Sequence, residues 1–571
     1  MILLQGIYNF LKFVIREISS MLIKFIFFIF LIILAFNYFS KTKKSPVTTK
    51  TYLKVDLSKE FKDTFIQSPL SLSPNSLNFY QLLNRVSASK DDDNILGIIL
   101  FLDGNTLNRT QIGELGECLK KFKATNKPIY SYGAYMDNNT LLLSSYSTES
   151  IMPPSESTAV NITGYIKDLP YYKDLTEKLG IEVNVVHVGD FKTYGENYTR
   201  SEMSPENRLD LKRILNKGYS FFIEDISKNL SFDIEKFNTL TLSGDLMGES
   251  SSILNKNKLI TSLAYWENFK KEKKIESLTE IGDYSLPKER LSKNQIAIIY
   301  AEGEINYSSS RNPTSNTITP DKIIPILEKV EKDKNIKGVI LRVNSPGGSA
   351  LASDIIYNSV KKMTKPVYVS IGSVAASGGY YISTAATKIF ANKDSITGSI
   401  GVVSLIPNFK KLSEKVGVNI EGISLGKFAD LYSLTAEMTP ERKEKIYNSN
   451  LKVYNEFLNK VAYGRNLPLN DVEKIAQGKV WLGEEAINIG LVDSIGGINT
   501  TIETLASDLN IQENYSVTEI PYEEDFKSMF ESNFFPIQTL LNLRLLDKSD
   551  LMKTLIKEDE LLFKPILYMS F

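Results

Sequence analysis

A serine in the stretch VAASGGYY, residues 374–381, has the surroundings of a nucleophile. The residues next to Ser377 are small, so the backbone of a peptide could come close to its hydroxyl. Gly378 and Gly379 follow it and begin a predicted helix, whose unpaired N–H groups favour a developing negative charge. The stretch therefore indicates acyl transfer, with Ser377 as the attacking group.

A second glycine-containing loop precedes this serine in the chain. RVNSPGGSA, residues 342–350, follows a predicted strand, and its two glycines allow backbone N–H groups to point outward. One donor from this loop and one after Ser377 would form an oxyanion hole. The predicted hole is lined by Gly347, Gly348 and Gly378, with either Gly347 or Gly348 as the loop donor.

The strands and helices that must carry these loops occur twice along the chain. Short apolar runs alternate with helical stretches, which predicts parallel β-α-β units with right-handed crossovers. The units follow the same order in two segments, so we expect an α/β protein with two copies of one domain, at 51–290 and 291–515. The matching stretches are NILGIIL (94–100) and NIKGVIL (335–341), KPIY (127–130) and KPVY (365–368), and MSPENR (203–208) and MTPERK (438–443).

The first copy lacks the nucleophile of the second. Where the second copy has SPGG, the first has GNTL at 104–107. Asn139 aligns with Ser377, or Asn138 does if the alignment takes a one-residue gap. Neither asparagine can act as a nucleophile, so the serine site exists in one copy only.

The reverse loss occurs further along the chain. LGIEVNVVHVGDFK (179–192) aligns with VGVNIEGISLGKFA (416–429), which places Lys192 of the first copy opposite Ala429 of the second. One copy keeps a serine and the other keeps a lysine. This pattern is expected if the two copies share one active site. We therefore predict that Lys192 is the general base for Ser377 in a Ser-Lys dyad.

A lysine can act as a base only where its charged form is disfavoured. Lowering its pKa from about 10.4 to about 7 takes roughly 4.6 kcal/mol, which burial can supply. Lys192 should therefore lie in a dry contact between the copies, with Glu196 pointing away from it. Two rival bases remain: His187, the one histidine of the chain, and Lys427, two positions before Ala429.

Together these motifs resemble the signal peptide peptidase A family, also called protease IV, in its long two-repeat form. The resemblance covers about residues 80–510. It lies in NSPGGSA, ASGGYYIST, ITGSIGV (396–402), VWLGEEAINIGLVDSIGG (480–497) and the lysine segment GDFKTYGENYTRSEMSPENR (189–208).

The resemblance implies a serine endopeptidase with two tandem crotonase/Clp-protease-like domains after an N-terminal transmembrane helix. Its members sit in the bacterial inner membrane with the catalytic domains outside the cytoplasm, degrade signal peptides released by signal peptidase, and assemble as bowl-like homo-oligomers, here implying a tetramer. Ser377 matches the family's nucleophile, Lys192 its base, and Gly347 or Gly348 and Gly378 its oxyanion hole. His187 is a departure from the family pattern.

The N-terminus predicts an uncleaved membrane anchor. FIFFIFLIILAF (25–36) and its flanks give an apolar stretch at 21–39, which as a helix would span about 28 Å. A short segment, 1–20, precedes it, and lysines and an arginine on both sides leave the orientation nearly balanced. Residues 516–571 do not repeat and are expected to form a C-terminal tail.

Composition excludes several other classes. Lys+Arg and Asp+Glu are equal at 67 each among 571 residues, which argues against a nucleic-acid-binding protein. A single histidine and a single cysteine, Cys118, leave no metal site or intrachain disulfide, and no cofactor is expected. Two alternatives remain: an acyl-CoA enzyme of crotonase type, and a non-catalytic membrane scaffold.

Overall fold

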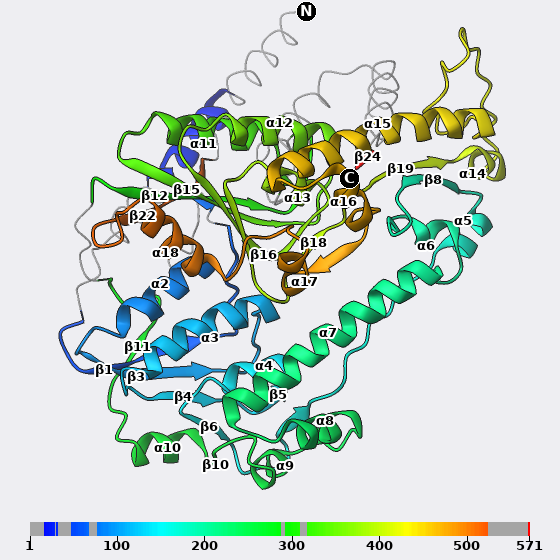
Figure 1. Ribbon diagram of the computed structural model, residues 1–571. Coiled ribbons are helices and arrows are strands. Elements are labelled where there is room, and N and C mark those ends of the chain that lie inside the picture. Colours follow the sequence, from blue (N-terminus) through cyan, green and yellow to red (C-terminus); the bar gives the residue numbers. More distant parts are fainter. Residues whose placement is uncertain are drawn as a thin grey trace, which may run out of the picture.

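The chain folds into two α/β domains that correspond to the two sequence repeats (Figure 1). The computed structural model describes residues 16–28, 30–31, 47–64, 66–67, 77–286, 292–308, 317–523 and 569–570. In the first repeat a parallel sheet has the strand order β10-β6-β4-β3-β1-β11. Its strands are β1 (Thr51–Asp56), β3 (Ile95–Phe101), β4 (Ile129–Tyr132), β6 (Glu149–Met152), β10 (Ser262–Leu263) and β11 (Leu278–Glu280).

The second repeat builds a sheet of the same kind, in the order β20-β18-β16-β15-β12-β22, with β17 and β21 beside β16. All its pairings are parallel except that of β18 with β20. The strands are β12 (Gln295–Glu302), β15 (Ile336–Ser345), β16 (Val367–Ala376), β17 (Lys388–Ala391), β18 (Ile396–Gly398), β20 (Val480–Leu482), β21 (Ser494–Ile495) and β22 (Ser516–Ile520).

Helices connect the parallel strands and cover the sheets, as the alternating pattern predicted. In the first repeat they are α2 (Phe79–Ser89), α3 (Arg109–Lys123), α4 (Asn138–Ser144), α5 (Lys173–Leu179), α6 (Glu196–Thr199), α7 (Pro205–Leu230), α8 (Ile234–Leu242), α9 (Ser251–Lys256) and α10 (Trp266–Glu272). In the second they are α11 (Pro320–Lys332), α12 (Ala350–Lys361), α13 (Gly378–Ser383), α14 (Lys410–Lys415), α15 (Pro440–Arg465), α16 (Leu469–Ile475), α17 (Gly483–Asn488) and α18 (Ile498–Asp508).

The two repeats share a hydrophobic core. Ile296, Ile298 and Ile340 of the second sheet are buried in the same cluster as Leu53 and Ile98 of the first. The opposite face of the second sheet packs on α11, α12 and α13 in a separate core. Because an apolar core joins the repeats, side chains from both can meet in fixed geometry.

One strand of each repeat leaves its sheet to pair with the other repeat. β8 (Glu182–Val188) of the first repeat runs antiparallel to β19 (Val402–Asn408) of the second. Two 26-residue helices, α7 and α15, follow these arms; each begins with Pro at its first position after a capping Ser204 or Thr439. This exchange brings the end of β8, and the lysine segment after it, onto the second repeat (Figure 1).

The second repeat extends beyond its predicted end at residue 515. Ser516–Ile520 forms β22, which pairs with β12 as β11 pairs with β1 in the first repeat. This short strand therefore belongs to the domain and not to the tail. Residues 524–568 of the tail lie outside the described residues, and Met569–Ser570 pairs with β19 as β24.

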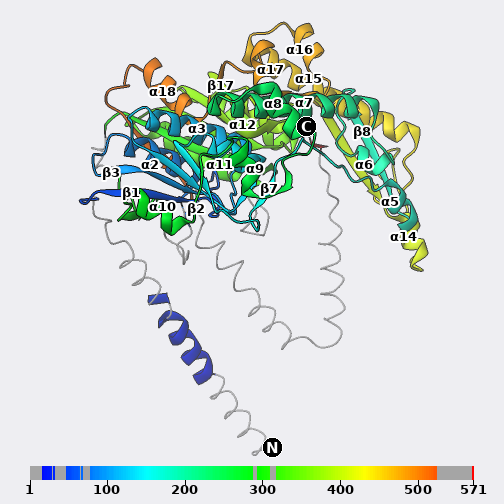
Figure 2. The ribbon, with the colours of Figure 1, turned by 90° about the horizontal axis from the view of Figure 1, so that it is seen from below.

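The predicted anchor is described in part. Residues 16–28 are helical with mostly exposed side chains, and Figure 2 shows this helix apart from the two domains. Residues 1–15, 29 and 32–46 lie outside the described residues. Within the described part of the chain, no helix is both long and apolar enough to cross a membrane.

Candidate active site

Ser377 lies at the turn between β16 and α13, as the sequence predicted. Its backbone has φ 58° and ψ −122°, a conformation that costs energy for a residue other than glycine. The N–H of Ser377 donates to the carbonyl of Gly398, 2.8 Å away, and holds the turn. The side chain is buried, with 2% of the residue exposed.

Lys192 reaches this serine from the other repeat. Its Nζ lies 2.8 Å from Ser377 Oγ, and the residue is 4% exposed. Nζ also donates to the carbonyl and the hydroxyl of Ser399, at 3.2 and 3.1 Å. The structure thus brings together the two side chains that the complementary loss between the copies singled out.

Burial lowers the pKa of Lys192 to about 7. Glu196 does not counteract this, because its carboxylate accepts hydrogen bonds from Tyr171 Oη (2.9 Å), the Ser204 N–H (3.0 Å) and Asn207 Nδ2 (3.1 Å). The expectation that Glu196 points away from Lys192 is confirmed. A substantial fraction of Lys192 is therefore neutral near pH 7.

Two glycines of the second repeat make room for the lysine. A Cβ on Gly401 would lie 3.1 Å from Lys192 Cδ. A Cβ on Gly478 would lie 2.5 Å from the Lys192 backbone N, and Gly478 has φ +77°. Local residue patterns did not single out Ser399, Gly401 or Gly478, although the motif ITGSIGV contains Ser399 and Gly401.

Two N–H groups near Ser377, those of Gly348 and Gly378, are free to bind an oxyanion. The N–H of Gly347 donates to Ser345 Oγ at 3.1 Å, so it is already used. Gly348 N–H has no acceptor among the described residues, and Gly378 begins α13, where an N–H has no intrahelical partner. A Cβ built on Gly378 would lie 3.3 Å from Gly348 N, so the two donors are adjacent. Of the two predicted loop donors, Gly348 is therefore the one whose N–H is free to bind an oxyanion.

A short parallel bridge holds the loop of Gly348 in place. The N–H of Ile305 donates to the Gly347 carbonyl at 2.8 Å, and the N–H of Ser349 donates to the Ile305 carbonyl at 2.7 Å. Gly348 lies between them with φ +145°, and a Cβ there would come within 2.1 Å of the Ile305 carbonyl oxygen. Only glycine fits this position.

The rival bases do not reach Ser377. His187 is exposed on β8, where its Nδ1 lies 3.0 Å from the Gly189 carbonyl. Lys427 is exposed and forms an ion pair with Glu441. In the first repeat, Asn138, which aligns with Ser377 if a one-residue gap is taken, uses its amide to bind both backbone groups of Thr163.

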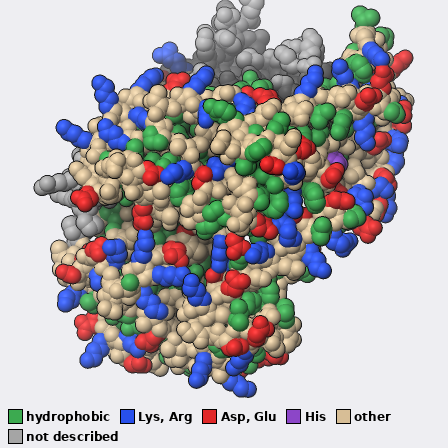
Figure 3. Space-filling view, in the orientation of Figure 1, with side chains coloured by type: hydrophobic (Ala, Val, Ile, Leu, Met, Phe, Trp, Pro, Cys, Tyr) green, Lys and Arg blue, Asp and Glu red, His purple; other side chains and the backbone are tan. Residues whose placement is uncertain are grey.

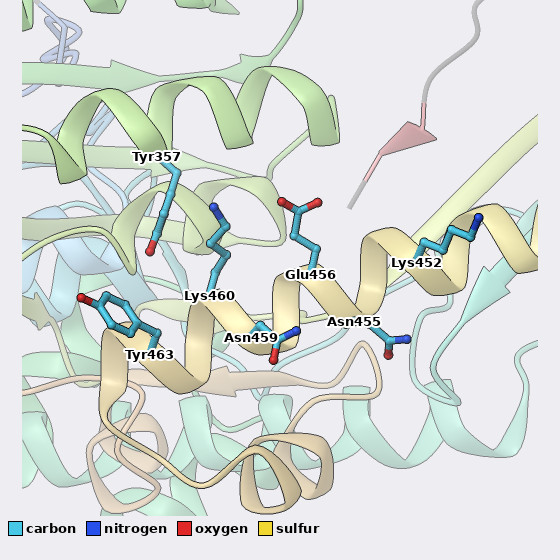
Figure 4. Close-up of a pocket in the computed structure, with 7 residues that line it drawn as sticks. All are labelled: Tyr357, Lys452, Asn455, Glu456, Asn459, Lys460 and Tyr463. Carbon is cyan, nitrogen blue, oxygen red and sulfur yellow. The ribbon is translucent and has the colours of Figure 1, made fainter.

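No group of three His, Cys, Asp or Glu residues in the described part of the chain is placed to hold a metal. A surface pocket of about 550 Å³ is lined by residues of α12 and α15 (Figure 4), and neither Ser377 nor Lys192 lines it. The pocket is lined by Tyr357, Lys452, Asn455, Glu456, Asn459, Lys460 and Tyr463.

On the face shown in Figure 3, acidic and basic side chains are interspersed, in keeping with the balanced composition.

A family model described as peptidase family S49 matches residues 121–279 and 359–512. The chain belongs to peptidase family S49. The first matched segment contains Lys192 and the second contains Ser377, so the S49 pattern covers both halves of the site. A Clp protease model also matches residues 290–395, which include the loop of Gly347 and Gly348.

Three proteases are similar to this S49 member over most of their own length. Protease 4 of Haemophilus influenzae is 30% identical over 79% of this chain and 76% of its own. The chloroplastic serine protease SPPA of Arabidopsis thaliana is 32% identical over 84% of this chain and 71% of its own. Protease 4 of Salmonella typhi is 31% identical, over 76% and 72%. This S49 chain is a serine protease with two Clp-like repeats.

Proposed function

We propose that this chain is a membrane-anchored endopeptidase that degrades released signal peptides and other apolar peptides with a Ser377–Lys192 dyad. The observation that carries the proposal is the 2.8 Å distance from Lys192 Nζ to Ser377 Oγ inside a buried contact. An acyl-CoA enzyme would need the oxyanion donors but not this pair.

In the proposed reaction, neutral Lys192 takes the proton of Ser377 as Oγ attacks the peptide carbonyl. The N–H groups of Gly348 and Gly378 bind the oxygen that becomes negative. Lys192 then gives its proton to the leaving amine, and it activates a water molecule to release the acyl group from Ser377. Ser399 orients Nζ throughout, because its hydroxyl and carbonyl both accept from it.

The N-terminal segment is proposed to hold the enzyme at a membrane, with its catalytic domains on the outer side of a bacterial cell membrane. Residues 16–28 are helical, and Met21, Phe25 and Phe28 expose large apolar side chains to solvent. The apolar run continues to Phe39 in the sequence. An anchored protease suits substrates that remain in or near the bilayer.

The active form is proposed to be a homo-oligomer, with a tetramer as the expected size. β8 pairs with β19 inside one chain, but the second repeat's counterpart of β8, residues 416–425, has no strand partner in the described part of the chain. Ile423 and Leu425 are fully exposed there. Continuing the alignment of 179–192 with 416–429 toward the N-terminus places Ile166 opposite β19. Ile166 is 80% exposed, so the same pairing between two chains would cover both segments.

The test uses the full-length chain with an apolar signal peptide as substrate. Lys192→Met keeps the bulk of the side chain and removes the amine, and Ser377→Ala removes the nucleophile. Each variant should lower kcat by a factor on the order of 10³ or more with folding retained. Activity that survives Ser377→Ala would contradict the serine mechanism, and activity that survives only Lys192→Met would contradict the choice of base.

A further inference from the structure

A buried carboxylate of the first repeat lies at the ends of the strands that carry the active-site loops of the second. Asp63 belongs to the segment between β1 and α2, and it is 5% exposed. Its neighbours are fixed by the first repeat: the Phe61 carbonyl accepts from Gln111 Nε2 at 2.9 Å, and the Lys62 carbonyl from the Phe79 N–H at 2.8 Å. These hydrogen bonds fix the backbone that precedes Asp63, and the Asp63 side chain contacts the second repeat.

The partners of Asp63 belong to the strand that leads to the oxyanion loop. Arg342 of β15 places Nε and Nη2 each 3.3 Å from Asp63 Oδ1, and its side chain is buried. Asn344, two residues on, points its Nδ2 at Asp63 Oδ2, 3.4 Å away. Both residues precede Gly348 by a few positions, so the Asp63 carboxylate contacts the strand just before that loop begins.

Asn344 also connects the other two strand ends. Its Oδ1 accepts from the Val374 N–H at 3.2 Å, three residues before Ser377. Its carbonyl accepts from the Gly303 N–H at 3.0 Å, just before β13 (Glu304–Ile305), whose Ile305 bridges to Gly348. The regular β15–β16 pairing is interrupted between Val343 and Ser345, so this side chain substitutes for the missing ladder contact.

Two other carboxylates, Glu114 and Glu302, lie near Asp63, so its own carboxylate depends on the donors Arg342 and Asn344. Glu114 accepts from Arg342 Nη2 (2.8 Å), Asn392 Nδ2 (3.0 Å) and the Ile498 N–H (2.8 Å), and Glu302 accepts from the Thr64 N–H (2.9 Å). The donors to Asp63 among the described residues are Arg342 and Asn344. Burial, with Glu114 and Glu302 nearby, raises the pKa of Asp63 to about 6 despite Arg342. At neutral pH the carboxylate is still mostly ionised.

We propose that Asp63 is a positioning residue for the oxyanion hole, and that its carboxylate holds Arg342 and Asn344 so that the Gly348 N–H points at the reacting oxygen. The inference rests on the proposed function of Ser377 and Lys192. It gives the first repeat a second task at the active site, because this repeat supplies both the base and the support of the oxyanion loop.

The test compares two inhibitors of the full-length chain, a peptide aldehyde and the matching peptide alcohol. With the aldehyde, Ser377 Oγ bonds to the carbonyl carbon, its proton moves to Lys192, and the carbonyl electron pair becomes the oxyanion in the hole. The alcohol binds without this bond. Asp63→Asn should lower the ratio of aldehyde to alcohol affinity by about tenfold or more, and kcat with it, while alcohol affinity and KM stay constant.

The control is Asp394→Asn, because Asp394 also pairs with a cation of the other repeat, Arg109 at 2.9 Å, but has no contact with the oxyanion loop. It should leave the ratio unchanged. An unchanged ratio in Asp63→Asn, or an equal loss for both inhibitors, would overturn the inference. Should Asp63→Asn not fold, Asn344→Ala must lower the ratio instead. Failure of the proposed function differs from all of these, because the wild-type chain would then bind aldehyde and alcohol equally.

Discussion

Glu196 follows Lys192 by four residues, yet its carboxylate is bound by Tyr171, Ser204 and Asn207 and leaves the lysine amine without a negative partner. A lysine buried with a carboxylate would stay charged and could not act as a base. The short helix α6 and the start of α7 thus keep the opposite charge away.

The first prediction concerns the pH dependence of the proposed peptidase activity. Burial lowers the pKa of Lys192 to about 7, and only the neutral amine can accept the proton of Ser377. The value of kcat/KM should therefore rise with pH, about tenfold per unit well below pH 7, and level off above it. A pH–rate profile from pH 5 to 9 measures this. A flat profile across that range would contradict Lys192 as the base.

The second concerns stability. A lysine with a lowered pKa binds its proton less readily in the folded chain than in the unfolded chain. Burial of the charged amine therefore lowers the free energy of unfolding by its full amount below pH 7, and by nothing above about pH 10.5, where the amine is neutral in both states. Lys192→Met should therefore raise the free energy of unfolding by up to about 4 kcal/mol at pH 7. The gain should shrink as the pH approaches 10.

Thermal unfolding at pH 7 and pH 10 measures this difference. Lys427→Met is the control, because that lysine is exposed, and it should change the melting temperature little at either pH. Equal stabilisation of Lys192→Met at both pH values would indicate a packing effect and not a cost of charge burial.

The third prediction concerns Ser399. Its hydroxyl and carbonyl both accept from Lys192 Nζ. Ser399→Ala removes the hydroxyl acceptor and should leave the amine less well oriented toward Ser377. We expect kcat to fall by roughly 10 to 100-fold with KM almost unchanged. Ser404→Ala removes a buried hydroxyl bonded to Asn450 and serves as the matched control. Equal losses in both variants would point to a general structural effect.

The fourth prediction concerns the space around the lysine. A methyl group at Gly401 would lie 3.1 Å from Lys192 Cδ and 2.9 Å from Gly478 Cα. Gly401→Ala should displace the amine from Ser377 and reduce kcat at least about tenfold. In contrast Gly113→Ala meets no atom within 4 Å and should retain activity. Full activity of Gly401→Ala would show that the contact is not needed.

The fifth prediction concerns assembly. Ile423 and Leu425 are proposed to be covered by a neighbouring chain, so Ile423→Lys together with Leu425→Lys should reduce the oligomer to smaller species. Light scattering after size-exclusion chromatography measures the mass in detergent. Leu469→Lys on α16 is the control for adding charge at an exposed apolar position. An unchanged mass in the double variant would place the contact elsewhere.

The sequence by itself determined the two-repeat α/β fold and singled out Ser377 and Lys192. It could do so because strand and helix periodicity is local and because each copy retains the residue type that the other has lost. Alternation of apolar strands with helices predicts a parallel sheet in any context, and a serine without a neighbouring histidine needs another base.

Only the tertiary structure decided which backbone groups complete the site. The choice of Gly348 over Gly347 depends on the hydrogen bond of the Gly347 N–H to Ser345 Oγ and on the bridge of Gly348 to Ile305, because these contacts fix the direction of each N–H. The contacts of Ser399 with Lys192 and of Asp63 with Asn344 join residues 207 and 281 positions apart. Such contacts leave no mark in local residue patterns, because they arise only when the shared core packs the two repeats together.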